Sequence, residues 1–197
     1  MDALPDLVIH EILKSLSTKQ AVRAIILSKQ WERVWFSVPA LDFDVDEIEQ
    51  LGEDDDLHAN RLRRHIKFAE FVTMCLKRRE KDKSLHRLRL RIRMRYLSLD
   101  ETCSSHIVRK CLRFAMNRHV KELYLAVIDG SESLFVLGNI EVSSSSLKSL
   151  EFISFPERHA RLQVEAMNLE SLGVGSEKGK SWSSYTIDFA SCGQLRN

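Results

Sequence analysis

The first forty residues contain more apolar surface than short helices of this size can bury among themselves. A first helix is predicted to begin at Pro5, whose missing N–H suits a first helical turn. Its apolar residues recur every three or four positions, at Val8, Ile9, Ile12, Leu13 and Leu16. They would form one apolar stripe, which must be covered by something other than water.

Two further helices are predicted before Pro39. Thr18 is expected to cap the second helix, which is apolar on nearly all sides. Ser28 is expected to cap the third helix, which carries Trp31 and Trp35. The surplus apolar surface of the three helices can be covered either by the rest of the same chain or by a partner protein.

A series of apolar and capping positions runs through this stretch. They are Leu4-Pro5-Asp6, Ile12-Leu13, Leu16, Thr18-Lys19, Ala21-Val22, Leu27-Ser28-Lys29, Trp31, Trp35 and Pro39 to Asp44. The series resembles the F-box motif, in particular the plant form that precedes leucine-rich repeats. This resemblance implies a three-helix module over residues 1–40 that docks on a Skp-type adaptor, which in turn joins a cullin-based ubiquitin ligase.

The resemblance also implies which residues make the docking surface. Those expected to face the adaptor, or to support the surface, are Leu4, Pro5, Ile9, Ile12, Leu13, Leu16, Val22, Leu27 and Trp31. Trp35 is expected instead to join the F-box to the following domain. The family often has an acidic residue in place of Leu7 and a proline in place of Ser17. Neither departure removes an apolar anchor, so both bear on the affinity for the adaptor more than on the resemblance to the family.

A second pattern, of apolar residues separated by two positions and then by one, recurs along the chain. Its copies are Val38-x-x-Leu41-x-Phe43, Leu85-x-x-Leu88-x-Leu90, Val120-x-x-Leu123-x-Leu125, Leu147-x-x-Leu150-x-Phe152 and Leu169-x-x-Leu172-x-Val174. This spacing is typical of the strand of a leucine-rich repeat, in which alternate apolar side chains point into a solenoid core. Helices near 60–79 and 106–117 are predicted between copies and account for their irregular spacing.

Together these patterns predict an α+β or α/β repeat architecture. A three-helix F-box is expected at residues 1–40, followed at 41–197 by a short, irregular leucine-rich-repeat solenoid. Its strands are expected near 41–44, 87–93, 122–127, 149–153 and 171–174, with a further strand at 185–189. No capping repeat is visible, so the solenoid is expected to be truncated at its C-terminus and poorly packed after Gly175.

Strand alternation predicts which side chains of the repeats face outward. The candidate substrate-binding residues on this face are Arg87, Arg89, Arg91, Tyr124 and Glu151. Its basic end would suit an acidic segment, a phosphate or a small anion. The alternative interpretation, which we favour, is that the arginines are solvated or pair with the acidic loop at 53–56.

Two charged segments raise the possibility of a metal site and of a site for nucleic acids or membranes. The acidic stretch at 42–56 contains carboxylates of the kind that bind calcium or magnesium, but the spacing does not match an EF-hand loop and favours a solvated loop. The predicted helix at 60–79 is strongly basic, as are helices that bind nucleic acids or anionic membranes. No aromatic residues alternate with its basic ones to stack on bases, which favours a solvated outer face.

The sequence contains no catalytic or cofactor-binding motif. Its seven histidines form no H-x-x-H or H-E-x-x-H pair, and no P-loop, G-x-S-x-G or G-x-G-x-x-G occurs. Cys111 is predicted to be a core thiol. We therefore expect a non-enzymatic protein without a metal or cofactor. The scattered cysteines, an N-terminus unlike a secretory signal and the lack of a long apolar run predict a cytoplasmic or nuclear protein.

The function implied by the resemblance is that of a substrate-recognition subunit in a Skp–cullin–F-box ubiquitin ligase. The expected partners are a Skp-type adaptor, cullin through that adaptor, and an unknown protein substrate, with no nucleic acid and no membrane. One alternative is an adaptor-binding protein that recruits no substrate for degradation. A third is a basic nucleic-acid-binding protein, although the net charge of +2 by itself argues neither for nor against a polyanionic partner.

Overall fold

The computed structural model describes residues 4–49, 58–80, 85–94, 100–129, 140–154, 161–175 and 186–189. The helices are α1 (Asp6–Ser15), α2 (Thr18–Ala24), the 3-10 helix η1 (Ile25–Leu27), α3 (Lys29–Trp35), α4 (Asp46–Glu49), α5 (His58–Arg78) and α6 (Asp100–Asn117). The strands are β1 (Ala40–Asp44), β2 (Arg87–Met94), β3 (Glu122–Asp129), β4 (Ile140–Ser143), β5 (Ser149–Ser154), β6 (Arg161–Glu165), β7 (Ser171–Gly175) and β8 (Thr186–Phe189).

Local sequence signals explain where the first three helices begin. Pro5 precedes α1, and Ser28 caps α3 by accepting a hydrogen bond from the backbone N–H of Trp31, as predicted. The predicted cap of α2 is wrong by one residue, because Ser17 forms a reciprocal capping box with Gln20. Thr18 is buried instead, and its hydroxyl oxygen accepts a hydrogen bond of 2.7 Å from the backbone N–H of Asp42.

The larger sheet is parallel throughout, with strand order β1-β2-β3-β5-β7. Its register aligns the repeated motif from strand to strand. The first leucine of each strand forms the row Leu41, Leu88, Leu123, Leu150 and Leu172, and the next apolar position forms the row Phe43, Leu90, Leu125, Phe152 and Val174. In β1, β2, β3 and β5 these residues are buried, and in β7 they are half-buried, so one face of the sheet is apolar.

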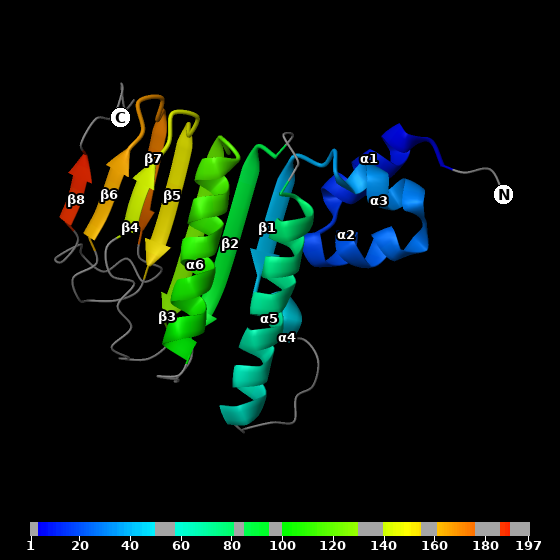
Figure 1. The fold of residues 1–197 in the computed structure, drawn as a ribbon, viewed down its shortest axis with the longest axis horizontal. Helices are drawn as coiled ribbons and strands as arrows, with labels where there is room; N and C mark the ends of the chain where they lie inside the picture. Colours follow the sequence, from blue (N-terminus) through cyan, green and yellow to red (C-terminus); the bar gives the residue numbers. More distant parts are fainter. Residues whose placement is uncertain are drawn as a thin grey trace.

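A second layer of helices and strands covers this apolar face (Figure 1). Helices α5 and α6 lie side by side over the sheet, roughly along the direction of its strands, and the smaller parallel sheet β4-β6-β8 continues their layer. The backbone N–H of Ser143 in β4 donates to the sulfur of Met116, at the end of α6, over 3.4 Å. Helices α1, α2 and α3 group beside β1, at the end of the sheet that begins the chain.

One continuous apolar core connects the N-terminal helices to the sheet. It runs from Ile9 and Leu13 of α1, through Trp35 and Leu41, to Leu169. Part of the apolar surplus predicted for the first forty residues is therefore covered by the same chain. The division into domains at residue 40 stays a prediction, because the two parts share this core.

The structure differs from the predicted fold in several elements. The predicted solenoid stays a prediction, because the described strands form two open sheets and no closed or solenoid sheet. Helix α6 begins at Asp100, earlier than expected, and α4, β4 and β6 were not predicted. Strand β8 lies within the further strand expected at 185–189. The expected poor packing after Gly175 otherwise falls outside the described residues.

Candidate functional site

The surface of the N-terminal helices exposes several large apolar side chains. Leu7 is 81% exposed and Ile26 is 83% exposed, whereas Leu4 and Val8 are exposed by nearly half. Leu7 and Val8 also line a shallow, mostly apolar depression on α1 together with Ile12. Large apolar groups left in water at these positions make this surface a candidate docking site.

The structure divides the predicted adaptor-binding residues into three groups. Leu4 and Pro5 are exposed, and Ile9 and Leu13 are buried in the core, where they support the surface from beneath. The half-buried group consists of Ile12, Leu16, Val22 and Trp31. The side chain of Leu27 is not among those that the structure describes.

Sequence reasoning missed the two most exposed apolar residues among those described in this region, Leu7 and Ile26. Ile26 belongs to a segment that is apolar on nearly all sides, so periodicity did not separate its outward side chain from its inward ones. Leu7 stands where an acidic residue is usual in the family, and this departure was the available signal. An apolar residue in that place enlarges the exposed apolar surface of α1.

Polar contacts fix the start of α1 against α3. The side-chain amide of Gln30 donates hydrogen bonds of 2.8 Å to the carbonyl oxygen of Leu4 and to the carboxylate of Asp6. Arg33 forms an ion pair with the same carboxylate at 3.0 Å. Hydrogen bonds from Gln30 and Arg33 lower the pKa of Asp6. These contacts orient the exposed Leu4 and Pro5 relative to α3.

Arg79, directly after α5, joins the N-terminal helices to the rest of the chain. It is 0% exposed, and its guanidinium donates to the carbonyl oxygens of Trp35 at 2.8 Å and Val38 at 2.5 Å. Trp35 is 1% exposed and belongs to the shared core, in keeping with the joining role expected for it. The N-terminal helices are thus held in a fixed position relative to α5.

All five candidate substrate-binding residues lie on the outward face of the larger sheet, which we call the strand face. Arg87 pairs with Glu122 at 2.6 Å, and Arg89 lies 5.0 Å from the ring centroid of Tyr124. Arg89, Tyr124 and Glu151 share one row across β2, β3 and β5. The predicted residues are therefore brought together on one surface.

Acidic residues of β1 neutralise the other two arginines of the strand face. Arg89 pairs with Asp42 at 3.5 Å, and Arg91 pairs with Asp44 at 3.3 Å. The expected partners at 53–56 lie outside the described residues. Partial burial raises the pKa of Asp42, and the positive charge of Arg89 opposes that rise. Among the described residues, these arginines of the strand face are therefore paired with acidic side chains, and their role in substrate binding stays a prediction.

The described residues contain no group of histidine, cysteine and carboxylate side chains arranged to hold a metal ion. Cys75 and Cys111 are buried free thiols, and burial raises the pKa of each to about 12. A thiol with such a pKa is almost entirely protonated at neutral pH and is a poor nucleophile. Within the same part of the chain, no helix is long and apolar enough to span a membrane.

Residues 1–41 match the family described as the F-box domain. The chain carries an F-box domain at its N-terminus. An F-box domain is in general a module that binds a Skp-type adaptor, and the exposed apolar groups of α1 and η1 lie within this one.

The F-box chain is similar to plant F-box and leucine-rich-repeat proteins. It is 49% identical over 53 residues to an F-box/FBD/LRR-repeat protein of Arabidopsis thaliana, covering 27% of the chain and 12% of the relative. A second Arabidopsis thaliana F-box/FBD/LRR-repeat protein is 34% identical over 94 residues, covering 48% of the chain and 18% of the relative. The matched part thus spans less than a fifth of these relatives' length. No solved structure gave a significant match.

Proposed function

We propose that this protein is the substrate-recognition subunit of a Skp–cullin–F-box ubiquitin ligase. Its F-box would bind a Skp-type adaptor, the adaptor would connect it to cullin, and the strand face would bind a target protein. The observation that carries the proposal is the F-box domain at residues 1–41, together with the exposed apolar side chains Leu4, Leu7 and Ile26 within it.

The proposed contribution of the chain to ubiquitin transfer is proximity. A receptor that holds a target near the conjugating enzyme raises its effective concentration without any chemistry of its own. Arg79 supports this role, because it fixes the F-box against α5 and so limits movement between the adaptor and the target surface. Such a receptor would act in the cytoplasm or the nucleus.

We further propose that the part after the F-box is a short leucine-rich-repeat solenoid. The parallel strand order and the aligned rows of leucines support it, because stacked repeats place equivalent residues side by side. The names of the Arabidopsis relatives support it as well. In this arrangement the strand face, with Tyr124 and Glu151 between the paired arginines and β7, is the surface for the target.

The adaptor half of the proposal is tested with purified Skp-type adaptor. The double substitution Leu4→Ala, Pro5→Ala removes exposed anchors and should weaken binding by about tenfold or more. Met167→Ala is a matched control, because Met167 is also a largely exposed apolar residue but follows β6. Equal affinity of the double variant and the wild type would overturn the F-box docking.

The target half is tested with the same variant in cells. Deleting residues 1–40 would expose the core that Ile9, Leu13 and Trp35 share with the sheet, so a point variant is the cleaner tool. A target for degradation should be captured by both the wild type and the Leu4→Ala, Pro5→Ala variant. Its cellular lifetime should lengthen only when the variant replaces the wild type. Captured proteins whose lifetimes do not change would indicate an adaptor-binding protein without a degradation substrate.

A further inference from the structure

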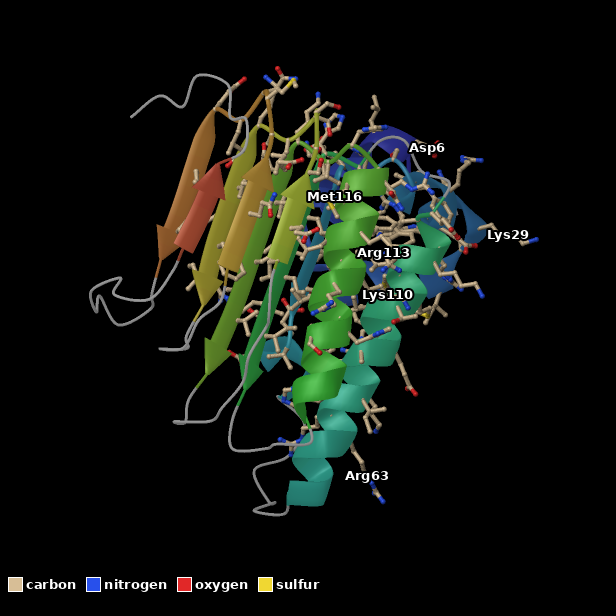
Figure 2. The ribbon with its side chains drawn as sticks, turned by 60° about the vertical axis from the view of Figure 1, so that its left-hand side comes forward. Asp6, Lys29, Arg63, Lys110, Arg113 and Met116 are labelled. Carbon is tan, nitrogen blue, oxygen red and sulfur yellow. The ribbon has the colours of Figure 1, made fainter. Side chains whose placement is uncertain are left out.

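Helices α5 and α6 present a basic surface that the proposed function does not use (Figure 2). We call it the helical basic face; it consists of Arg63, Arg64, Lys67, Lys77 and Arg78 from α5, Lys110, Arg109 and Arg113 from α6, and Arg118 directly after α6. All of these side chains are exposed or half-exposed. The buried residues of both helices point to the sheet, so the helical basic face is on the side of the molecule opposite the strand face.

Within the described part of the chain, most cations of the helical basic face have no acidic partner, in contrast to the arginines of the strand face. Among the described residues, Arg78 pairs with Glu32 at 3.7 Å, and the ammonium group of Lys110 donates to the hydroxyl of Thr73 at 3.2 Å. The remaining cations of the face make no ion pair within the described part of the chain. Repulsion between these unpaired cations would be relieved by an anionic partner.

The same surface exposes two large apolar side chains among its cations. Ile66 is 39% exposed and Met74 is 38% exposed, and both lie on the outward stripe of α5. Glu70 lies between them on this stripe and is also exposed. A polyphosphate backbone gains nothing from the exposed Ile66 and Met74, whereas a polypeptide that carries apolar side chains can cover them.

We propose that the helical basic face binds an acidic polypeptide segment that carries apolar side chains, supplied by a partner protein. The acidic groups would pair with cations such as Arg109 and Arg113, and the apolar groups would cover Ile66 and Met74. Helices α5 and α6, of 21 and 18 residues, are roughly 30 Å long and can accommodate a helical segment of about 20 residues. This site lies outside both the F-box and the strand face, so all three can be occupied together.

The test measures binding of the full 197-residue chain to three fluorescent probes. They are a peptide of about 20 residues made of glutamate, aspartate and regularly spaced leucine, a polyglutamate peptide of equal length, and a DNA duplex of comparable length. The acidic leucine-containing peptide should bind tightest, and its affinity should fall with added salt, because salt screens exposed charges. A duplex that binds equally well or better would overturn the proposal in favour of a nucleic-acid surface.

Two variants separate the electrostatic from the apolar contribution. Arg109→Glu with Arg113→Glu should weaken binding of the leucine-containing peptide by about tenfold or more. Lys121→Glu with Lys148→Glu is the control, because it makes the same change in charge on exposed lysines outside the face. Ile66→Ser with Met74→Ser should weaken binding of the leucine-containing peptide by about fivefold and leave binding of polyglutamate unchanged.

Folding of each variant is checked by far-UV circular dichroism. If the charge reversals unfold the chain, Arg109→Gln with Arg113→Gln replaces them with the same expected direction. Unchanged peptide binding in either folded arginine variant would overturn the proposed site. Unchanged binding in the Ile66→Ser, Met74→Ser variant would overturn the apolar character of the partner segment. Adaptor binding should stay at the wild-type level in all of these variants, so the outcome is independent of the proposed function.

Discussion

The guanidinium group of Arg79 lies 4.9 Å from the centroid of the Trp35 ring and donates a hydrogen bond of 2.8 Å to the carbonyl oxygen of the same residue. A second donor of Arg79 reaches the carbonyl oxygen of Val38 at 2.5 Å. These carbonyls lie at and after the C-terminal end of α3, where the partial negative charge of the helix favours a cation. One buried side chain therefore connects α5, the F-box and the segment that leads into β1.

Replacing this arginine should destabilise the whole chain. In Arg79→Ala the buried carbonyls of Trp35 and Val38 lose a charged donor, and a cavity forms beside the indole ring. We expect the free energy of unfolding to fall by about 2–4 kcal/mol, as for other losses of buried, charge-assisted hydrogen bonds. Urea denaturation followed by tryptophan fluorescence measures this change.

The neighbouring residue provides the control for Arg79. Arg78 forms an ion pair with Glu32 at 3.7 Å, and both side chains are exposed by nearly half. Exposed pairs of this kind contribute less than about 1 kcal/mol, so Arg78→Ala should change stability only slightly. Similar losses in the two variants would contradict the joining role of Arg79.

The position of Arg79 could have been predicted from the sequence. It lies four residues after Cys75 and seven after Val72, in line with the apolar stripe of α5, but its basic neighbours led to its assignment to the solvated face. The charge pairs of the strand face could also have been predicted. Aligning the repeated motifs places Asp42 beside Arg89, which is the register of β1 and β2.

Other elements carried too weak a signal in the sequence. Strand β4 contains only Ile140 and Val142 as alternating apolar residues, and β6 contains only Leu162 and Val164. Two alternating positions occur by chance in many loops, so periodicity alone does not identify such strands. These strands become recognisable only when the parallel sheet β4-β6-β8 is assembled by contacts between distant segments.

The aligned rows of leucines predict a gradient of stability across the larger sheet. Leu123 lies in the central strand β3 and is buried, so Leu123→Ala should lower the free energy of unfolding by about 2–5 kcal/mol. Leu172 occupies the same row in β7 but is half-buried, so Leu172→Ala should cost roughly 1–2 kcal/mol. Equal costs in urea denaturation would show that the two strands are packed alike.

Asp42 should contribute to the pH dependence of the stability of the chain. Burial raises the pKa of its carboxyl above 3.8 in the folded chain, so the folded state holds this proton over a pH range in which the unfolded state has released it. Stability from this group is therefore fully present below pH 3.8 and is lost as the pH rises through the folded pKa. An NMR titration of the Asp42 carboxyl measures the shift.

Removing the cation beside Asp42 should increase its pKa. Arg89 stabilises the ionised carboxylate, so Arg89→Gln should raise the pKa of Asp42 further above its usual value. Lys148→Gln is a control of equal charge change, because Lys148 pairs with Glu170, away from β1. A pKa of Asp42 that is lowered in Arg89→Gln would contradict the ion pair.

The buried thiols should report on unfolding. With pKa values raised to about 12, Cys75 and Cys111 are thiolates in only about one molecule in ten thousand at pH 8. In a Cys103→Ser, Cys192→Ser background, we expect maleimide to label neither thiol in the folded chain and both in urea. Mass spectrometry of the labelled chain measures this. Rapid labelling without urea would show that the core around α5 and α6 opens readily.

Exposed and buried apolar residues of the F-box should separate adaptor binding from folding. Leu7 and Ile26 are more than four-fifths exposed, so Leu7→Asp with Ile26→Asp should change the free energy of unfolding by less than about 0.5 kcal/mol per site. If these residues form part of the docking surface, burying two carboxylates there should weaken adaptor binding by about a hundredfold, as titration calorimetry measures.

Ile9 provides the opposite case on the same helix, because it is fully buried in the core that the F-box shares with the sheet. Ile9→Ala should lower the free energy of unfolding by about 2–5 kcal/mol. Any loss of adaptor binding in this variant should then follow its loss of folded protein, since the side chain supports the surface from beneath. Wild-type adaptor affinity in Leu7→Asp, Ile26→Asp would exclude both residues from the docking surface. It would leave Leu4 and Pro5, at the start of α1, as the exposed anchors to test.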